Sequence, residues 1–493
     1  MKSILLVYFG GFQGNVFSDS RSEKLSFEKG TDYMKKTVCE LFAGVGGFRC
    51  GLNSIKSIED AKRPEKWETV WFSQWEPEKT KQWAHDCYVN HFGQPLDLSG
   101  KATTNMDIAA VEKKDIPEHS LLVGGFPCQD YSVARSLSGE KGIEGKKGVL
   151  WWSIRDVIQA KKPPFILLEN VDRLIKSPST QRGRDFAIIL ACLRDEGYIV
   201  EWRILNAAEY GYVQRRRRTF IFAYKKDTNF AKDIMRSATY LEFEEPSIKT
   251  DFPRNIIEKK GFFAQAFPVR ELDDSDTIKT ISLDKGLVDV SDRFKFDFEN
   301  TGFMMNGKIF TVKTTPPVTN SVLLGDILED GVVSEKYFIP ESKLYYTDPA
   351  ERYSDETEQD LPKEFRQTWQ YLKGGKKRLR KAKNGHEYIF SEGPISMVDE
   401  WDAPARTMLT SEGSFNRSTH IVRDKETRRI RILTPIETER IQGFPDDWTK
   451  DCLVDGKITP MPERMRYFCM GNALVVDLIN QMEPVLSKII DNE

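Results

Sequence analysis

The segment Thr37-Val-Cys-Glu-Leu-Phe-Ala-Gly-Val-Gly-Gly47 decides the fold class of this chain. Its first half is an apolar run, which predicts a buried strand, and its second half is a glycine-rich turn that leads into a helical pattern. Glycines allow the backbone to turn tightly and to approach a ligand closely. The segment therefore predicts a strand–turn–helix unit that opens an α/β domain and holds a ligand at its turn.

The same alternation of strands and helices continues to about residue 226. Apolar runs typical of strands lie at 37–42, 68–74, 120–126, 165–168, 199–205 and 219–224. Helical periodicity separates them, most clearly over 148–160 and 182–195. This order predicts a Rossmann-like, doubly wound and mostly parallel sheet, in which ligands bind beyond the carboxyl ends of the strands.

Composition and charge exclude several classes of protein. The 493 residues are 39% hydrophobic and 30% charged, with a net charge of −2, which is typical of a globular protein and gives no global sign of a nucleic-acid partner. No two of the seven cysteines have CxxC spacing, which indicates neither a zinc site nor a disulfide framework and fits a reducing cytoplasm. No apolar run reaches the roughly 18 residues that cross a membrane.

The chain divides into four predicted parts. Residues 10–33 are polar and weakly periodic, and because Met34 leads directly into the first strand, we expect translation to start there and residues 1–33 to be dispensable. Short apolar pieces broken by Pro, Gly and Asp replace the α/β rhythm after residue 228, which predicts a second, irregular domain. The predicted parts are the extension 1–33, a catalytic and cofactor-binding domain 34–228, a second domain 229–464 with a supporting motif at 427–448, and a segment 465–493 that packs back on the first domain.

Residues at the ends of the first strands suit a nucleoside. The second strand ends in Gln74-Trp-Glu76, where an acid can bind ribose hydroxyls and an aromatic ring can stack on adenine. Asp107, in Asn105-Met-Asp-Ile108, can accept a hydrogen bond from an exocyclic amine. Together with the glycine turn, these positions predict a nucleoside pocket.

A cysteine and a carboxylate follow the next two strands. The run Ser120-Leu-Leu-Val-Gly-Gly-Phe-Pro-Cys-Gln129 ends in glycines and delivers the thiol of Cys128 to the rim of the sheet, where it is a candidate nucleophile. Glu169-Asn-Val171 follows an apolar run, and a carboxylate there is partly withdrawn from water and can act as an acid.

Four consecutive arginines precede the last strand of the first domain. They lie in Gln214-Arg-Arg-Arg-Arg218, and strand alternation sends Arg216 and Arg218 to one side and Arg215 and Arg217 to the other. One pair can therefore point into the site while the other meets solvent or phosphate.

These blocks, in this order, resemble the cytosine-C5 DNA methyltransferase family over residues 38–480. Phe42–Gly47 is similar to the first S-adenosylmethionine motif of that family, and Gly125–Gln129 is similar to its catalytic motif. The other similar blocks are Glu169–Val171, Gln214–Arg218, Leu324–Glu329, Arg406–Thr410, Arg431–Pro435, Arg440–Pro445 and Gly471–Ala473. The resemblance implies an S-adenosylmethionine-dependent methyltransferase fold, with a target-recognition domain in the irregular region.

The resemblance also implies a reaction and its residues. Cys128 would attack C6 of a cytosine flipped out of double-stranded DNA, after which C5 would take the methyl group of S-adenosylmethionine; no metal is implied. The implied catalytic residues are Cys128, Glu169, Asn170, Arg216 and Arg218. The implied cofactor residues are Phe42, Ala43, Gly44, Gly46, Gly47, Trp75, Glu76, Asp107, Ile108, Pro127, Leu150 and Asn472. The implied DNA contacts are Gln129, Arg135, Lys141, Lys146, Arg406, Thr407 and Thr410.

Several points stay open in the sequence. Gln74 stands where the family usually has its acid, so the residue that meets the ribose is Gln74, Trp75 or Glu76. The basic run Lys373–Lys383 predicts either phosphate contacts or a solvated face.

The resemblance implies a cytoplasmic monomer that protects host DNA beside a cognate restriction endonuclease. One alternative is a transfer-RNA cytosine-5 methyltransferase, but the long region 229–425 favours DNA because the RNA enzymes have a much shorter variable region. The other alternative is an inactive DNA-binding relative, against which the presence of Cys128, Glu169 and the glycines argues.

Overall fold

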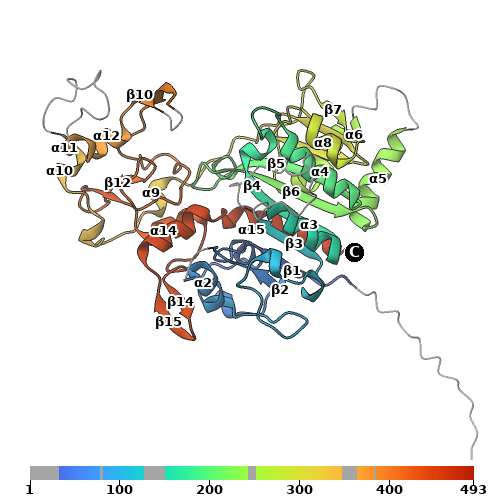
Figure 1. Cartoon of the computed structure of the whole chain (residues 1–493), viewed down its shortest axis with the longest axis horizontal. Coiled ribbons are helices and arrows are strands. Elements are labelled where there is room, and N and C mark those ends of the chain that lie inside the picture. The colour runs from blue at the N-terminus through green and yellow to red at the C-terminus, as the bar shows by residue number, and fades with distance from the viewer. Residues whose placement is uncertain (1–32, 78–80, 127–149, 243–250, 347–362, 382–384) are drawn as a thin grey trace, which may run out of the picture. The chain divides into compact units, whose positions relative to one another are not determined.

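A nine-stranded sheet forms the centre of the fold (Figure 1). The computed structural model describes residues 33–77, 81–126, 150–242, 251–346, 363–381 and 385–493, and Met34–Glu493 form a structural unit separate from Met1–Tyr33. The strand order is β2-β1-β3-β4-β6-β5-β8-β9-β7. The strands are β1 (Thr37–Leu41), β2 (Glu68–Ser73), β3 (Leu121–Gly125), β4 (Phe165–Val171), β5 (Tyr198–Asn206), β6 (Arg217–Lys225), β7 (Lys279–Ser282), β8 (Thr301–Met305) and β9 (Lys308–Val312).

Helices connect the strands and cover the sheet. In the first half of the chain they are α1 (Gly47–Leu52), α2 (Trp83–Phe92), α3 (Leu150–Lys161), α4 (Arg184–Asp195), α5 (Asn229–Glu242), α6 (Asp251–Asn255), α7 (Phe262–Ala266) and α8 (Leu287–Arg293). In the second half they are α9 (Leu324–Ile327), α10 (Glu341–Leu344), α11 (Lys363–Arg366), α12 (Trp369–Lys373), α13 (Pro435–Gln442), α14 (Glu463–Asn472) and α15 (Val476–Ile490).

Each face of the sheet has its own hydrophobic core, because side chains alternate along a strand. On β3, Leu122 belongs to the core that contains the apolar residues of α3 and α4. Its neighbours Leu121 and Val123 belong to the core that contains residues of α1, α7 and α15. The sheet is thus buried on both faces, which leaves its edges and strand ends for a functional site.

The predicted α/β architecture is confirmed. All six predicted strands and both predicted helices form, within a few residues of their expected limits. The sheet is mixed: pairing is parallel through β2-β1-β3-β4 and antiparallel through β4-β6-β5-β8-β9-β7. The glycine turn and the ends of β2, β3 and β4 that the sequence analysis singled out lie in the parallel half. The sequence predicted a mostly parallel sheet, and this prediction does not hold for the antiparallel half.

The sheet continues past the predicted domain limit at residue 229. β8 and β9 form a hairpin that pairs with β5, with Val200 opposite Met304. Asn306 and Gly307 form its turn with φ angles of 51° and 77°, as a two-residue hairpin requires. Residues 279–312 therefore supply strands to the main sheet, although the sequence placed them in the irregular domain.

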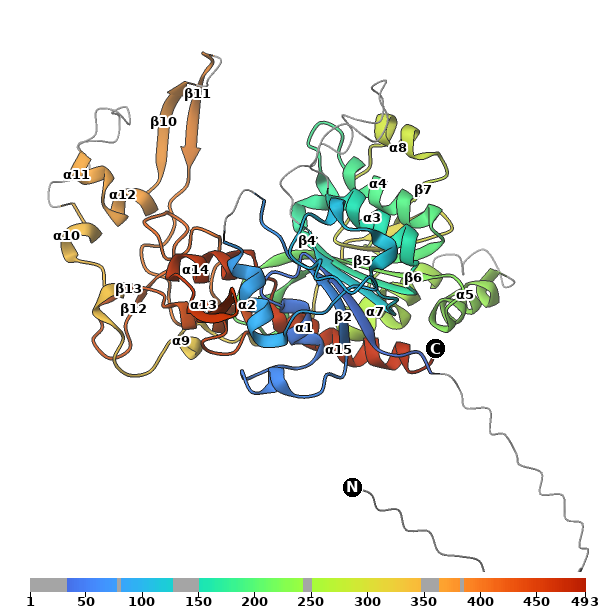
Figure 2. The ribbon, with the colours of Figure 1, turned by 60° about the horizontal axis from the view of Figure 1, so that its bottom comes forward.

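The C-terminal helix lies against the beginning of the chain. Figure 2 shows α15 beside α1, and the two approach so closely that a Cβ atom at Gly51 would lie 2.4 Å from Cβ of Ile479. Trp67 Nε1 also donates to Glu483 at 2.9 Å. Three two-stranded sheets complete the described structure: β10 (Lys376–Lys381) with β11 (Glu387–Glu392), β12 (Ile421–Arg423) with β13 (Ile430–Ile432), and β14 (Asp451–Val454) with β15 (Lys457–Pro460).

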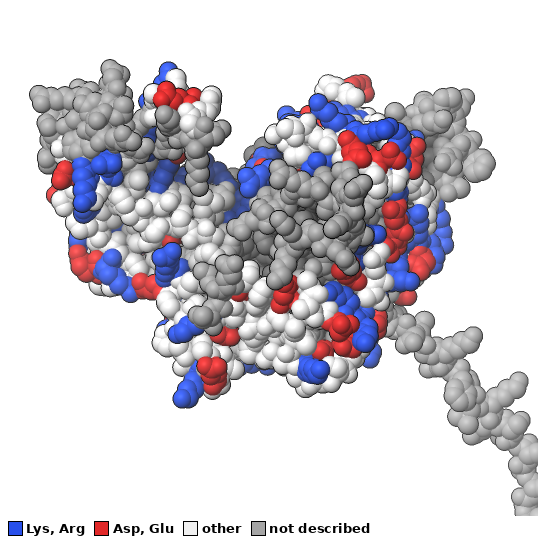
Figure 3. Space-filling view, in the orientation of Figure 1, with Lys and Arg blue, Asp and Glu red and all other residues white. Residues whose placement is uncertain are grey.

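Charge is mixed over the surface. Figure 3 shows acidic and basic side chains interspersed among the described residues of one face, in agreement with the net charge of −2. Among the described residues, the longest apolar helix is still too short or too polar to span a bilayer.

Candidate active site

The glycine turn after β1 is held in a conformation that glycine favours. Gly44 and Gly46 have φ angles of 57° and 91°, in the left-handed region. A Cβ atom at Gly46 would lie 2.9 Å from the ring of Phe92 on α2, whereas the position at Gly44 has open space around it. The turn is therefore closed on the side of α2 and open at Gly44, where a ligand could approach the backbone.

Gln74 supports this turn from the end of β2. Its Oε1 atom accepts a hydrogen bond from the backbone N–H of Gly44 at 2.8 Å. Its own N–H donates to the carbonyl of Thr104 at 2.9 Å, which joins the ends of β1 and β2 to the segment that contains Asp107. Two other residues were candidates for this place: Trp75 is 39% exposed, and the backbone of Glu76 is held by two hydrogen bonds with the Gln82 side chain.

Three further predicted ligand residues gather at one core. Ile108 is buried in it, and Phe42 and Leu150 pack against it. Asp107 accepts a hydrogen bond from the N–H of Ala109 at 2.9 Å through Oδ1. Asn472 is the exposed last residue of α14. Phe42, Ile108 and Leu150 therefore share one core, and Asp107 directly precedes its member Ile108.

The described residues fit a nucleoside ligand that carries a cationic group. Glu40, directly before the turn, is buried, and its Oε1 atom accepts no hydrogen bond. Burial raises the pKa of Glu40 to about 7, against the hydrogen bond from Tyr88 and the charge of Arg49. An unused acceptor on the strand before an open glycine turn, and the partly exposed indole of Trp75 next to Gln74, suit a ligand with donors and an aromatic base.

An ion pair joins the ends of β4 and β6. Nε of Arg218 lies 2.8 Å from Oε1 of Glu169, and both side chains are only 16% and 12% exposed. Glu169 pairs with Gly125 in the sheet, and a Cβ atom at Gly125 would lie 3.3 Å from Oε2 of Glu169. A carboxylate held by a guanidinium thus faces the carboxyl end of β3, where the predicted nucleophile follows.

Asn170 fixes the last described residue before that nucleophile. Its Nδ2 donates to the carbonyl of Phe126 at 2.8 Å, and its Oδ1 accepts from the N–H of Val171. Asn170 is 1% exposed, so these bonds form away from water and hold their geometry. Pro127, Cys128, Gln129, Arg135, Lys141 and Lys146 lie outside the described residues.

Arg216 does not reach Glu169. Arg216 is buried and Arg215 and Arg217 are exposed, as strand alternation predicts. Its Nη1 and Nη2 atoms donate to the carbonyls of Met408 and Gly471, at 2.9 and 3.0 Å. The structure therefore brings Arg218, but not Arg216, to the carboxylate.

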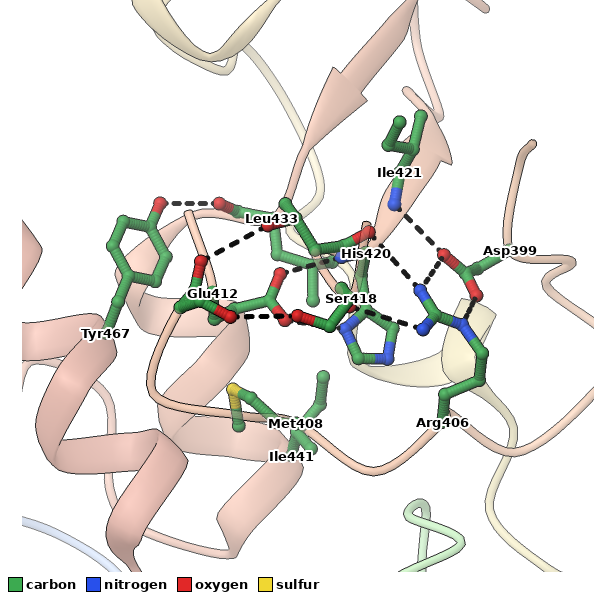
Figure 4. Close-up of polar contacts among 12 residues, drawn as sticks. Asp399, Arg406, Met408, Glu412, Ser418, His420, Ile421, Leu433, Ile441 and Tyr467 are labelled. Atoms are coloured by element: carbon green, nitrogen blue, oxygen red, sulfur yellow. Dashed lines mark hydrogen bonds and ion pairs between the residues drawn. The ribbon is translucent and has the colours of Figure 1, made fainter. Parts of the chain in front are cut away.

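The predicted DNA contact Arg406 has its donors inside the protein (Figure 4). Its guanidinium binds both carboxylate oxygens of Asp399, at 2.5 and 3.0 Å, and donates to the carbonyls of Ser418 and Thr419. Thr407 donates through Oγ1 to the carbonyl of Arg215 at 2.6 Å, whereas Thr410 is exposed. Arg406 therefore shapes the segment that continues to Thr410.

Two residues that contact the glycine turn, Trp448 and Leu474, were not predicted from the sequence. Trp448 donates through Nε1 to the carbonyl of Val45 at 2.9 Å, and its ring stacks on His91 at a centroid distance of 3.7 Å. Leu474 lies so near Gly47 that a Cβ atom there would be 3.1 Å from its Cγ. Both residues are more than 400 positions from the turn, so local periodicity could not indicate them.

Comparison with known proteins identifies the family of the chain. The family model described as C-5 cytosine-specific DNA methylase matches residues 36–488. Type II methyltransferase M.Sau3AI of Staphylococcus aureus is 45% identical over 457 residues, which cover 92% of this chain and 96% of that protein. Two shorter matches are M.NgoBI of Neisseria gonorrhoeae, 33% identical over 40% of this chain and 53% of its own length, and M.HhaI of Haemophilus parahaemolyticus, 30% identical over 38% and 49%.

The family match spans the glycine turn, the Glu169–Arg218 pair and the C-terminal helix together. The chain therefore belongs to the C-5 cytosine-specific DNA methylase family and is a DNA (cytosine-5-)-methyltransferase that uses S-adenosylmethionine.

Proposed function

We propose that Cys128 adds to C6 of a cytosine flipped out of a specific duplex sequence, and that Glu169 binds the same base. The Glu169–Arg218 ion pair at 2.8 Å supports this proposal most directly. It lies beside Gly125 in the sheet, and only Phe126 and Pro127 separate that strand end from Cys128. A flipped base costs a few kcal/mol of stacking, so the site must supply compensating hydrogen bonds.

The covalent step uses groups of this chain. The Cys128 thiolate forms a sulfur–carbon bond to C6, and the electron pair of the C5=C6 bond makes C5 nucleophilic. S-adenosylmethionine, when bound, would supply an electrophilic methyl group to C5, with cleavage of its sulfur–methyl bond and release of S-adenosylhomocysteine. Removal of the C5 proton by a base then expels the thiolate from C6 and restores the ring. Glu169 accepts from the exocyclic amine of the base and shares the proton taken up at N3, while Arg218 holds the carboxylate in place.

The glycine turn and its neighbours hold the methyl donor in this proposal. The donor's amino-acid portion lies at the turn and its adenosine against the ends of β1 and β2. The residues assigned to it are Phe42, Ala43, Gly44, Gly46, Gly47, Gln74, Trp75, Glu76, Asp107, Ile108, Pro127, Leu150 and Asn472. Gln129, Arg135, Lys141 and Lys146 after the nucleophile, and Thr407 and Thr410 in the second region, are assigned to the DNA.

The proposed setting is a restriction-modification system. The chain is similar over nearly its whole length to a Type II methyltransferase, which supports host protection beside a cognate restriction endonuclease. We assign it to the cytoplasm as a monomer, because a single chain carries the glycine turn, Glu169, Arg218 and Cys128.

Trapping with 5-fluorocytosine tests the proposal. Fluorine at C5 cannot be removed as a proton is, so the adduct should persist and appear as a protein–DNA band that survives denaturation. Duplex DNA amplified with 5-fluorodeoxycytidine triphosphate contains every candidate target and requires no knowledge of the recognition sequence. The wild type with S-adenosylmethionine should form the band, and Cys128→Ser should not form it while it still binds the duplex.

Two outcomes would overturn the proposal. A band formed equally by Cys128→Ser would exclude that thiol as the nucleophile. Methyl transfer to transfer RNA without any transfer to genomic DNA would favour the RNA enzyme instead. If genomic DNA is methylated, bisulfite sequencing of host DNA that has been exposed to the enzyme would read out the recognition sequence.

A further inference from the structure

Arg216 lies where three distant segments of the chain meet. Its guanidinium donates to Met408 in the second region and to Gly471 at the end of α14, while its own backbone directly precedes β6. The residue is 1% exposed. One side chain therefore links the strand that carries Arg218 to two segments more than 190 residues away in sequence.

The charge of Arg216 is poorly compensated for a buried group. Within the described part of the chain no carboxylate lies within ion-pair distance of it, and its Nε atom has no hydrogen-bond partner. The pKa of Arg216 is lowered to about 9, mainly by burial and to a smaller extent by the charge of Arg218, while the charge of Glu169 opposes the shift. A buried cation without a counter-charge is costly, and an apolar side chain of similar size would pack at lower cost. The presence of such a cation at this junction, with two backbone carbonyls as its partners, points to a role beyond packing.

The segment 405–410 is joined to the residues around Arg216 by several hydrogen bonds. The N–H of Ala405 donates to Val213 at 2.7 Å, and the N–H of Arg215 donates to Ala405 at 2.8 Å. The N–H of Met408 donates to Oε1 of Gln214 at 3.3 Å. The hydrogen bond from Arg216 to the carbonyl of Met408 thus adds to the bonds that already hold the segment 405–410 beside residues 213–215.

The same segment presses against Gly471. A Cβ atom at Gly471 would lie 2.4 Å from the backbone carbon of Leu409 and from the nitrogen of Thr410. Gln442 holds the preceding carbonyl, that of Met470, at 2.6 Å. The position of Asn472 is therefore set by the contact of 409–410 with Gly471 and by the hydrogen bond from Arg216.

Figure 4 shows how the segment is held at its other side. Arg406 and Asp399 face one another, and Met408 lies near Ile441 beneath the buried pair of Glu412 and His420. Met408 is 0% exposed, and its carbonyl is fixed by Arg216 from the side of the catalytic domain.

From this junction we infer that Arg216 is a positioning residue, which does not touch the cytosine but fixes Gly471–Asn472 and the segment 405–410 relative to β6. Arg218, at the start of β6, holds Glu169. By tying the start of β6 to Gly471–Asn472, Arg216 therefore fixes the position of the methyl-donor site relative to the base site. The inference rests on the proposed function in assigning Asn472 to the methyl donor and Glu169 to the base.

Binding of S-adenosylhomocysteine to the free enzyme tests this role without turnover. Arg216→Met removes both donors, and the Kd measured by calorimetry should rise about tenfold or more, while Arg216→Lys, which keeps the charge and can reach one carbonyl, should recover only part of the affinity. In methyl-transfer kinetics the KM for S-adenosylmethionine should rise in Arg216→Met by more than the KM for DNA, because the hydrogen bonds of the Ala405 and Met408 N–H groups still hold the segment 405–410.

Arg203 on β5 provides a matched control. It is also a buried arginine with an unpartnered Nε, and it donates to the carbonyls of Ile257, Phe263 and Phe267, away from the site. Arg203→Met should lower Tm without changing the Kd for S-adenosylhomocysteine. If Arg216→Met does not fold, the comparison of Arg216→Lys with Arg203→Lys carries the test, with a several-fold rise in Kd expected only for Arg216→Lys.

The role is overturned if the rise in Kd follows the loss of Tm equally in both arginine series, because Arg216 would then be structural only. It is also overturned if Arg216→Met binds S-adenosylhomocysteine normally but no longer traps 5-fluorocytosine, since Arg216 would then act on the base. Failure of the proposed function would instead show in the wild type, as an absence of any trapped adduct.

Discussion

Arg218 Nε lies 2.8 Å from Oε1 of Glu169, whereas Arg216, two residues earlier and just before β6 begins, donates to Met408 and Gly471. Two arginines that look equivalent in the sequence therefore have different partners. Arg218 binds the carboxylate of Glu169, which we assign to the base, and Arg216 connects two backbone segments.

Arg218→Met should reduce kcat by about 10- to 100-fold, because a charge-assisted hydrogen bond contributes roughly 1.5–3 kcal/mol. Arg217→Met is the matched control, since Arg217 is 51% exposed and its Nε lies 3.6 Å from Asp172. Single-turnover methyl transfer on genomic DNA measures both variants. Equal losses in the two would contradict a special role for the Glu169 pair.

Gln74→Ala should raise the Kd for S-adenosylhomocysteine about fivefold to tenfold. The substitution removes the acceptor of the Gly44 N–H, and an unsatisfied backbone donor costs about 1–1.5 kcal/mol. Gln74→Glu keeps an acceptor at this place and should bind nearly as the wild type does. Unchanged binding by Gln74→Ala together with weak binding by Glu76→Ala would give the ribose role to Glu76 alone.

Gly46→Ala should destabilise the protein by about 2–4 kcal/mol, from left-handed backbone strain and from overpacking against Phe92. Gly456→Ala is the control: Gly456 has φ 75° but no atom within 4 Å of its Cβ position, so only the strain of about 1–2 kcal/mol applies. Urea unfolding measures both free energies. A loss no larger at residue 46 than at residue 456 would show that Phe92 yields without cost.

Arg406→Met should lower stability by about 1.5–3 kcal/mol, because it removes the charge-assisted hydrogen bonds to buried Asp399, which keeps Lys373 Nζ at 3.9 Å and the N–H of Ile421 as partners. The dependence of log Kd for DNA on log salt concentration should keep its slope, since the guanidinium is already bound within the protein. A slope smaller by about 0.9 would mean that Arg406 contacts a phosphate.

Lys377→Ala tests whether the basic run Lys373–Lys383 contacts phosphates or is a solvated face. The measurement is again the dependence of log Kd for DNA on log salt concentration. Lys377 is exposed on β10. A phosphate contact predicts a slope smaller by about 0.9, and a solvated face predicts no change.

Glu40 should make stability fall as pH rises from about 5 to about 7. Its pKa is raised by burial from 4.5 to about 7, so between these values the folded state holds a proton that the unfolded state has released. Protonation thus favours the folded state, and this contribution, on the order of 3 kcal/mol, is present below the unfolded value and lost as pH rises through the folded one.

Glu40→Gln removes this titration. Urea unfolding at pH 5 and pH 8 should show the variant gaining stability relative to the wild type at the higher pH, while other titrating groups cancel in the difference. The same difference at both pH values would show that Glu40 does not titrate between them.

The features that could be predicted from the sequence are those that depend on neighbouring residues. The apolar runs that became β1 to β6 and the glycine turn at 44–46 were readable because strand periodicity and the φ preference of glycine are properties of neighbouring residues. The hairpin of β8 and β9 carried an equally local signal, Asn306-Gly307 between apolar residues, but it lies in a region whose irregular composition suggested a separate domain.

The sequence by itself determined the α/β order, the glycine turn and the sequence of reactive residues from Cys128 to Arg218, because each depends on a few adjacent positions. Only the tertiary structure decided that Gln74 holds the turn, that Arg218 rather than Arg216 meets Glu169, and that Arg406 binds Asp399. These choices depend on which distant segments pack together. A side chain finds its partner through the contacts of the whole fold, and no local period records them.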